Sequence, residues 1–243
     1  FGFIVQAINR DFNINRLERY LTICNASKVT PIVVFTKIDL ISETELTSIL
    51  KSVRERIQNV KIIPISNETK IGLDTLKSVI EKGRTYCLLG SSGVGKSTLI
   101  NSISGENLMK TGEISESIDR GKHVTTRREL IILESGGIII DNPGMREVGV
   151  TESSGGLEAT FETIFELAKQ CRFSDCTHIH ENGCAILDAI EDGEMDEDSY
   201  DNYLRLEREK QFFESSSQDK KRNDKNLGKL IKSAQKNKRR SKY

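Results

Sequence analysis

A glycine-rich segment at residues 90–97 carries the clearest chemistry in the sequence. It reads G-S-S-G-V-G-K-S, which fits G-x-x-x-x-G-K-[ST], and it lies between an expected strand and an expected helix. Its glycines let backbone N–H groups surround phosphate oxygens, and the helix N-terminus adds partial positive charge. We expect Lys96 to reach the β- and γ-phosphates and the Ser97 hydroxyl to bind Mg²⁺. The expected nucleotide contacts in this loop are Gly90, Ser92, Gly93, Val94, Gly95, Lys96, Ser97 and Thr98.

A second motif, T-K-I-D at 36–39, predicts which base the nucleotide carries. It follows an apolar run at 31–35, and the carboxyl end of such a strand is where open α/β sheets bind ligands. The expected base contacts are Thr36, Lys37 and Asp39. The Asp39 carboxylate can accept hydrogen bonds from guanine N1–H and the 2-amino group, a pair that adenine lacks. Ser66 stands where guanine-binding proteins have an S-A element, although Asn67 replaces the alanine. The motif favours GTP over ATP.

A third motif, D-N-P-G at 141–144, fits the pattern D-x-x-G after an apolar strand. In this interpretation Asp141 holds a water molecule of Mg²⁺ and the Gly144 N–H meets the γ-phosphate. The alternative is a plain β-turn, since N-P-G is turn chemistry in any protein.

The polar segment 121–126, G-K-H-V-T-T, supplies the expected catalytic residues. Thr125 or Thr126 can give Mg²⁺ a second hydroxyl when the nucleotide orders the segment. Many GTPases have a glutamine directly after D-x-x-G that orients the attacking water, whereas this chain has Met145. His123 is the nearest substitute, because a neutral imidazole can hydrogen-bond a water. The alternative is a polar surface histidine.

The sequence around these motifs predicts alternating strands and helices. Expected strands cover 3–8, 31–35, 61–65, 85–89, 129–134 and 137–140, and expected helices cover 15–25, 42–58, 73–82 and 96–103. This alternation requires right-handed crossovers and predicts an α/β fold with a doubly wound, mostly parallel sheet. We expect this first domain to cover 1–150, followed by a small, mainly helical domain over 151–243.

Composition and charge bound the remaining possibilities. The chain has 243 residues, 36% hydrophobic and 30% charged, with no membrane-span or signal-peptide pattern. Its net charge is zero, yet residues 220–243 hold eleven bases and one acid. We expect this tail to be a disordered, solvated end, with phosphate binding as the alternative. Three cysteines and two histidines cluster at 171–184, a pattern that indicates a metal site rather than disulfides in a cytosolic protein.

The motifs stand in permuted order, because the base-reading motif precedes the phosphate loop and D-x-x-G comes last. With this order, the chain resembles the RsgA (YjeQ) family of circularly permuted GTPases. The resemblance rests on T-K-I-D, G-S-S-G-V-G-K-S-T-L-I-N, R-G-K-H-V-T-T, D-N-P-G-M-R-E and C-x4-C-x-H-x5-C, and it covers most of residues 1–206. It departs at Val124, where the family usually has threonine.

This resemblance implies a GTPase that acts in late maturation of the small (30S) ribosomal subunit, is stimulated by that subunit and binds its rRNA. It also implies one zinc ion on Cys171, Cys176, His178 and Cys184, in a closed and therefore structural site. His180 is left as a competing nitrogen ligand. The family begins with an OB domain, which we expect this chain to lack. We further expect Mg²⁺ with GTP or GDP, a monomer, no membrane partner, and a cytoplasmic location, or an organellar one in a eukaryote.

Three alternatives stay open on the sequence alone. The first is an assembly factor in which GTP acts as a timer and hydrolysis only licenses release. The second is a zinc-containing RNA-binding module with a weak or degenerate nucleotide site. The third is an ATPase.

Overall fold

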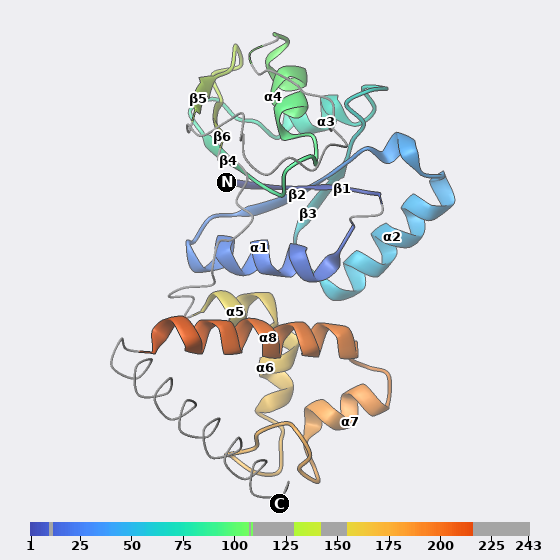
Figure 1. Cartoon of the computed structure of the whole chain (residues 1–243), viewed down its shortest axis with the longest axis vertical. Helices are drawn as coiled ribbons and strands as arrows, with labels where there is room; N and C mark the ends of the chain where they lie inside the picture. Colours follow the sequence, from blue (N-terminus) through green and yellow to red (C-terminus); the bar gives the residue numbers. More distant parts are fainter. Residues whose placement is uncertain (10–11, 107, 109–128, 142–154, 216–243) are drawn as a thin grey trace, which may run out of the picture.

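Figure 1 shows the chain in a computed structural model, which describes residues 1–9, 12–106, 108, 129–141 and 155–215. The strands are β1 (Gly2–Ala7), β2 (Pro31–Thr36), β3 (Lys61–Pro64), β4 (Thr85–Leu89), β5 (Glu129–Ile132) and β6 (Ile138–Asp141). The helices are α1 (Ile14–Ala26), the 3-10 helix η1 (Ile38–Leu40), α2 (Glu43–Arg56), α3 (Leu73–Ser78), α4 (Lys96–Ser104), α5 (Gly156–Thr160), α6 (Glu162–Ala168), α7 (Ala185–Glu191) and α8 (Glu197–Glu214).

The six strands form one sheet in the order β3-β2-β1-β4-β6-β5. All neighbours run parallel except β5, which pairs antiparallel with β6. The order reverses at β1 and β4, since β1 leads outward to β2 and β3 whereas β4 leads the other way. Such a switch point leaves a crevice at the carboxyl ends of the strands, where open α/β sheets bind ligands. The predicted α/β fold with a mostly parallel sheet is confirmed.

Helices cover both faces of this sheet (Figure 1). On one face, Leu17 and Leu21 of α1 join Val33 of β2 in a buried apolar cluster that α2 also covers. On the other face, Leu99 of α4 joins Tyr86 of β4 in a second cluster, which includes α3. Each fully buried leucine contributes roughly 1.5–3 kcal/mol through removal of apolar surface from water. These two layers hold the strand ends, and the loops after them, in fixed positions.

Helix α3 is shorter than the sequence predicts. Helical spacing predicts 73–82, but the helix ends at Ser78. Tyr86 on the neighbouring strand β4 explains the difference, because its hydroxyl donates to the Val79 carbonyl oxygen at 2.7 Å and accepts from the Glu81 N–H at 3.0 Å. A tertiary partner therefore replaces the hydrogen bonds that would extend the helix.

The helices after residue 155 form a second unit with its own core. Leu157, Phe161, Tyr203 and Leu206 are buried together with residues of α7. The rings of Phe161 and Tyr203 meet edge to face, with centroids 5.6 Å apart. This unit is mainly helical among the described residues, as the sequence predicts for the second domain.

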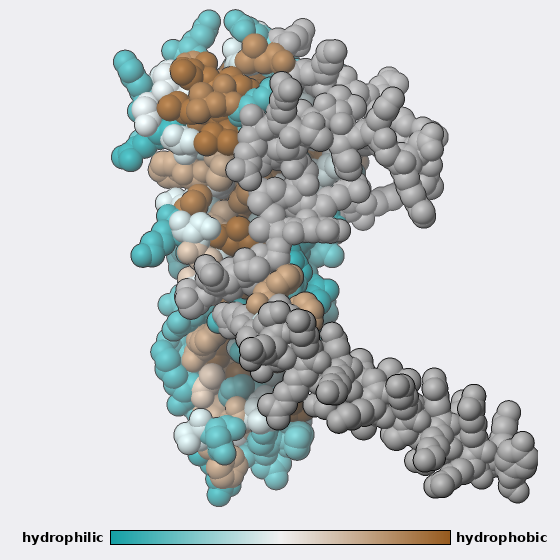
Figure 2. Space-filling view, turned by 60° about the vertical axis from the view of Figure 1, so that its left-hand side comes forward, coloured by the Kyte–Doolittle hydropathy of each residue, from teal (hydrophilic) through white to brown (hydrophobic). Residues whose placement is uncertain are grey.

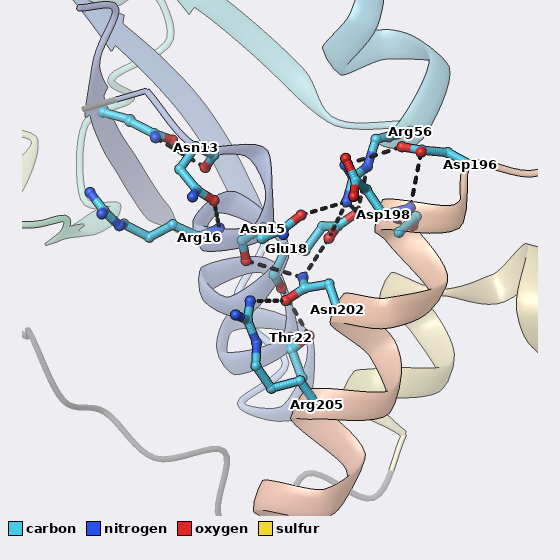
Figure 3. A network of polar contacts seen from close by, with 12 residues as sticks. Asn13, Asn15, Arg16, Glu18, Thr22, Arg56, Asp196, Asp198, Asn202 and Arg205 are labelled. Atoms are coloured by element: carbon cyan, nitrogen blue, oxygen red, sulfur yellow. Dashed lines mark hydrogen bonds and ion pairs between the residues drawn. The ribbon is translucent and has the colours of Figure 1, made fainter. Parts of the chain in front are cut away.

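The two units meet along α1, and Figure 3 shows the polar contacts at this interface. The Glu18 carboxylate, 2% exposed, accepts from Arg56 Nη2 at 2.8 Å and from Asn202 Nδ2 of α8 at 2.5 Å. Arg56 also pairs with Asp196 at 3.1 Å, and Ser199 donates to Glu18 at 3.2 Å. Burial raises the pKa of Glu18, while the Arg56 charge opposes that rise. The buried carboxylate thus accepts hydrogen bonds from two elements, α2 through Arg56 and α8 through Ser199 and Asn202.

Further contacts run along the same interface. Arg19 of α1 holds Glu209 of α8 through two hydrogen bonds of 2.8 and 2.6 Å. Thr22 lies beside Thr160 of α5, with their hydroxyls 3.2 Å apart. At Gly156 an added Cβ would lie 2.6 Å from the Thr22 carbonyl oxygen, so only glycine permits this close approach of α5 to α1. The interface therefore fixes α1 against the helical unit along its length.

Figure 2 brings the β5 side of the molecule forward and shows hydrophobic side chains gathered over that end of the sheet. Leu130 and Ile132 of β5 are 63% and 70% exposed there.

Among the described residues, no helix combines the length and apolar character that crossing a bilayer requires.

Candidate functional site

Residues from four of the predicted site segments lie at one edge of the sheet. The segments after β2, β3 and β4 and the end of β6 lie at the carboxyl ends of parallel strands. These ends carry Thr36, Ser66, Gly90 and Asp141, respectively. Because parallel strands present their carboxyl ends at the same edge, residues as far apart in the sequence as Thr36 and Asp141 lie at one edge of the sheet, where open α/β sheets bind ligands.

The phosphate loop depends on glycine at its first position. Gly90 has φ 155°, and an added Cβ would lie 2.3 Å from the Val5 carbonyl oxygen of β1. Gly93 and Gly95 have φ values of 79° and 93°, in the left-handed region that side chains disfavour. Ser92, which precedes Gly93, is exposed. The loop can therefore turn tightly between β4 and the first turn of α4.

Lys96 begins α4 and folds back over the loop. Its side chain is buried, and Nζ donates to the carbonyl oxygens of Gly90 at 2.8 Å and Ser91 at 2.7 Å. The next residues in the first helical turn are Ser97, half-buried, and Thr98, exposed. This turn places an ammonium group and a hydroxyl beside backbone N–H groups, a donor set suited to polyphosphate and its cation.

The base-reading motif is tied directly to the phosphate loop. The Thr36 hydroxyl, fully buried, donates to the Val94 carbonyl oxygen at 2.6 Å. Lys37 follows with φ 61°, a strained conformation for a side chain-bearing residue, which turns the chain into η1. Strain of this kind is found at ligand sites, where the surrounding contacts enforce it.

Asp39 lies in η1 with its carboxylate fixed on one side. Oδ1 accepts a short hydrogen bond from the Ser66 hydroxyl, and Ser66 Oγ in turn accepts from the Thr69 N–H at 3.0 Å. Ser66 is fully buried, whereas Asp39 is exposed. The Ser66 contact therefore restricts the orientation of a carboxylate that is otherwise open to solvent.

Asp141 closes the site at the end of β6. It is 4% exposed, and its Oδ1 is enclosed without a hydrogen-bond partner among the described residues. Burial raises the pKa of the Asp141 carboxyl, the Lys96 ammonium lowers it, and Glu129 raises it. An enclosed carboxylate oxygen without a partner costs about 1–3 kcal/mol, and an added cation would satisfy it. The Asp141 carboxylate and the Ser97 hydroxyl offer oxygen ligands of the kind that Mg²⁺ prefers.

A second constellation lies between α6 and α7. Ligand atoms of Cys171, Cys176, His178 and Cys184 all lie within 4.8 Å of one another. His178 Nδ1 is 3.4 Å from the sulfurs of Cys171 and Cys184, which are 3.9 Å apart. A tetrahedral zinc ion with ordinary bond lengths requires sulfur–sulfur separations of about 3.8 Å and sulfur–nitrogen separations of about 3.6 Å. The residues present fit one zinc ion.

The loop between these ligands is held by Glu181. Its carboxylate accepts from the Thr177 N–H and hydroxyl and from the backbone N–H groups of Ile179 and His180. These donors lower the pKa of Glu181 well below its ordinary value. His178 takes φ 60° in this loop, and its carbonyl oxygen accepts from the Tyr200 hydroxyl at 2.8 Å. His180 is exposed and does not join the four-residue cluster.

Four predicted site residues lie outside the described part of the chain: His123, Thr125, Thr126 and Gly144. Among the described residues, sequence reasoning missed Arg16, whose guanidinium reaches the phosphate loop at Ser91. Seventy-five positions separate the two residues, and no periodicity or motif marks the contact. The sequence also gave no sign that the Asn67 amide oxygen lies enclosed beside the loop.

Comparisons with known proteins agree with this geometry. Residues 2–151 match a family model described as RsgA GTPase. Small ribosomal subunit biogenesis GTPase RsgA 2 of Listeria monocytogenes is 46% identical over 209 residues, which are 86% of this chain and 60% of that protein. The RsgA 2 protein of Vibrio vulnificus is 38% identical over 240 residues, or 99% of this chain and 68% of that protein. The chain thus spans about 60% of the length of the Listeria relative.

Solved structures show the same fold. The crystal structure of YjeQ from Thermotoga maritima aligns with a TM-score of 0.63 and 27% identity, over 84% of this chain and 69% of that one. The structure of YloQ, described as a circularly permuted GTPase, aligns with a TM-score of 0.60 and 24% identity, over 88% and 69%. The permuted order inferred from the motifs is confirmed at the level of the fold.

Proposed function

The chain belongs to the RsgA GTPase family, and from that premise we propose that it binds GTP with Mg²⁺ and hydrolyses it to GDP and phosphate. The observation that carries the proposal is the joining of the base-reading and phosphate-binding segments. Thr36 bonds the loop at Val94, while Ser66 orients Asp39 at the same edge. An ATPase would have no use for a carboxylate fixed in this position, because adenine lacks the matching donors.

Each residue has a defined role in the proposed reaction. The loop N–H groups of Gly93, Val94 and Gly95 and the Lys96 ammonium would bind the β- and γ-phosphates. Ser97 and a water on Asp141 would hold Mg²⁺, which supplies charge neutralisation at the transferred phosphoryl group when bound. The energetic gain is electrostatic, since the donors are positioned before the reaction begins.

The residues that orient the attacking water belong to the same proposal. We assign His123 to that role, with Thr125 or Thr126 on Mg²⁺ and the Gly144 N–H on the γ-phosphate. Met145 has no group that could orient a water, so intrinsic turnover is expected to be slow. A partner that orders these segments would then raise the rate.

That partner is proposed to be the small ribosomal subunit and its rRNA, by analogy with the relatives, whose names assign them to biogenesis of that subunit. The Cys171–Cys184 cluster would hold one structural zinc ion and so order the helical unit. We propose that the protein acts as a monomer in the compartment where ribosomes are assembled. The intact motifs give no support to an RNA-binding module with a degenerate nucleotide site.

Turnover measurements test this function. GTP hydrolysis by the chain is measured alone and with purified 30S subunits, with Lys96→Ala as the variant and Lys82→Ala, an exposed lysine, as the matched control. We expect slow turnover alone, stimulation by 30S subunits, and loss of both in Lys96→Ala only. Turnover in Lys96→Ala equal to that of the unaltered chain would refute the proposed site, whereas turnover without stimulation would refute the ribosomal partner.

A further inference from the structure

Arg16 brings a positive charge to the phosphate loop from a helix outside the known motifs. It lies in the first turn of α1, and its Nη1 donates to the Ser91 hydroxyl at 3.3 Å. Figure 3 shows the side chain leaving α1 on the side away from Glu18 and Asn202, the residues that face the helical unit. Arg16 therefore belongs to the nucleotide edge of the molecule rather than to the interface between the units.

The backbone that carries Arg16 is held in place from three directions. The Asn13 side chain caps α1 by accepting from the Arg16 N–H at 3.0 Å. Gln6, on the central strand β1, donates to the Asn13 carbonyl oxygen at 3.1 Å. Leu17, the next residue, is fully buried against the sheet. The guanidinium is thus delivered from a rigid position beside the loop.

Two cations converge on a single residue of the loop. The Ser91 carbonyl oxygen accepts from Lys96 Nζ at 2.7 Å, and the Ser91 hydroxyl accepts from Arg16. Within the described ranges, the Arg16 side chain has no ion pair with any carboxylate, and this is its one hydrogen bond. A guanidinium has five N–H donors, so four remain for a ligand.

Arg16 is half-buried, has no carboxylate partner among the described residues, and lies beside a loop that is suited to bind phosphate. A phosphate group is therefore the ligand that best fits its guanidinium. Guanidinium groups bind phosphate oxygens through paired, charge-assisted hydrogen bonds. The Lys96 ammonium already serves the β- and γ-phosphates in the proposed function. A second cation that approaches from α1 would therefore increase the affinity of the loop for the terminal phosphate, which carries the most negative charge.

We propose that Arg16 is a second cation of the phosphate site, which contacts the terminal phosphate of bound GTP and so favours triphosphate over diphosphate. This inference rests on the proposed function. In the reaction, water adds to the γ-phosphorus, the bond to the β–γ bridging oxygen breaks, and GDP leaves with that electron pair. The water supplies the proton that is released or retained on phosphate. Arg16 stays protonated throughout and stabilises the charge on the γ-phosphoryl oxygens.

The test compares a triphosphate with a diphosphate. Affinities for guanosine 5′-(β,γ-imido)triphosphate and for GDP are measured by calorimetry with Mg²⁺. The variants are Arg16→Gln, which keeps most of the aliphatic stem, and Arg16→Lys, which keeps the charge. Arg84→Ala is the control, because Arg84 is exposed and pairs with Glu81. We expect Arg16→Gln to weaken triphosphate binding about 10- to 100-fold and GDP binding less than about threefold, with Arg16→Lys in between.

A structural role would produce a different pattern. If Arg16 only braced Ser91, both nucleotides would lose affinity by the same factor, and that result would overturn the inference. Unchanged binding of both nucleotides would also overturn it. If the unaltered chain bound neither nucleotide, the proposed function would fall first and this inference with it. Single-turnover hydrolysis gives a second readout, since a γ-phosphate contact predicts slower hydrolysis in Arg16→Gln at saturating GTP.

Discussion

At the scale of single residues, the site depends on short polar contacts that orient otherwise mobile groups. Asp39 is the clearest case, because an exposed carboxylate can adopt many rotamers unless a neighbour fixes it. Ser66 does so from a fully buried position, and the Thr69 N–H holds the Ser66 oxygen in turn. In the proposed function the base would meet a pre-oriented carboxylate, which lowers the entropy lost on binding.

Ser66→Ala is expected to weaken GDP binding about tenfold, because Asp39 then loses the hydrogen bond that orients it. Binding of the diphosphate chain itself should not change. Ser78→Ala is the control, since the Ser78 hydroxyl only donates to the Thr75 carbonyl oxygen on an exposed helix. Titrations with a fluorescent GDP analogue measure both. A Ser66→Ala affinity equal to that of the control variant would show that Ser66 does not serve the base site.

The metal cluster offers a second prediction at this scale. His178→Ala should lower the zinc content from about one ion per chain to near zero, since the site loses its only nitrogen ligand. His180→Ala should leave it unchanged, because His180 is exposed and outside the cluster. Metal analysis of the purified variants distinguishes them. Equal zinc loss in both variants, or zinc loss in His180→Ala alone, would contradict the ligand set.

Some of these positions are predictable from the sequence and others are not, for a physical reason. Loops that bind phosphate or guanine are local patterns, so their residues could be named from spacing alone. The choice between His178 and His180 could not, because both spacings suit zinc and only the turn at His178, with φ 60°, brings its ring to the thiols. Arg16 was missed because its partner lies 75 positions away.

At the scale of elements, helix ends fix where the site's segments begin. Helix α2 follows the base-reading motif and begins with a capping box. Ser42 accepts from the Glu45 N–H at 3.3 Å, and Glu45 accepts from the Ser42 N–H at 2.8 Å. The cap therefore sets the chain direction only three residues after Asp39.

Ser42→Ala is expected to lower the free energy of unfolding by about 1 kcal/mol. The Ser42 hydrogen bonds also lower the pKa of Glu45, so its ionised form is the one the fold favours. A carboxyl with a depressed folded pKa stabilises the fold above its unfolded pKa, about 4.3, and loses that contribution as pH falls. Urea unfolding from pH 7 to pH 3 measures the effect.

Glu45→Gln serves as the comparison, because a glutamine can still accept from the Ser42 N–H but does not titrate. The unaltered chain should lose more stability than Glu45→Gln as pH falls through the pKa of Glu45. Parallel pH profiles for the two proteins would show that the capping box carries no charge-dependent stability.

Strands and the loop helix were predicted within a few residues, since apolar runs and the glycine motif are local signals. Helix α3 was predicted too long because the competing partner, the Tyr86 hydroxyl, comes from another strand. Pro64 lies in β3, the edge strand of the sheet, where a missing N–H costs no ladder hydrogen bond. Local sequence patterns thus predict which helices and strands form, whereas tertiary contacts determine where some of them end.

At the scale of the whole molecule, α1 connects the two ends of the structure. One side of the helix meets the phosphate loop through Arg16, and the other meets α8 through Glu18 and Arg19. The burial of Glu18 is not predictable from the sequence, since a glutamate on a helix is expected to lie on the solvent-exposed polar face. The interface could therefore not be predicted from the sequence, because it depends on how α1, α2 and α8 pack together.

Arg56→Ala is expected to destabilise the protein by about 3–5 kcal/mol, because it leaves the buried Glu18 carboxylate without its charge partner. Arg54→Ala, exposed on the same helix, should cost less than about 0.5 kcal/mol. Thermal and urea unfolding measure both. Adding Glu18→Gln to Arg56→Ala should recover part of the loss, since the buried charge is then gone. Equal stability of Arg54→Ala and Arg56→Ala would contradict a structural role for the pair.

Under the proposed function, segments in permuted order build one guanine-nucleotide site, and equilibrium binding distinguishes such a site from an adenine-nucleotide site. GDP and ADP are titrated with Mg²⁺ into the unaltered chain and into Asp39→Asn. The account predicts that the unaltered chain binds GDP at least about 100-fold more tightly than ADP. Asp39→Asn should lose most of that preference and gain affinity for xanthosine diphosphate, whose 2-oxo group accepts from an asparagine amide. Equal affinity for GDP and ADP in the unaltered chain, or an unchanged GDP preference in Asp39→Asn, would contradict the account.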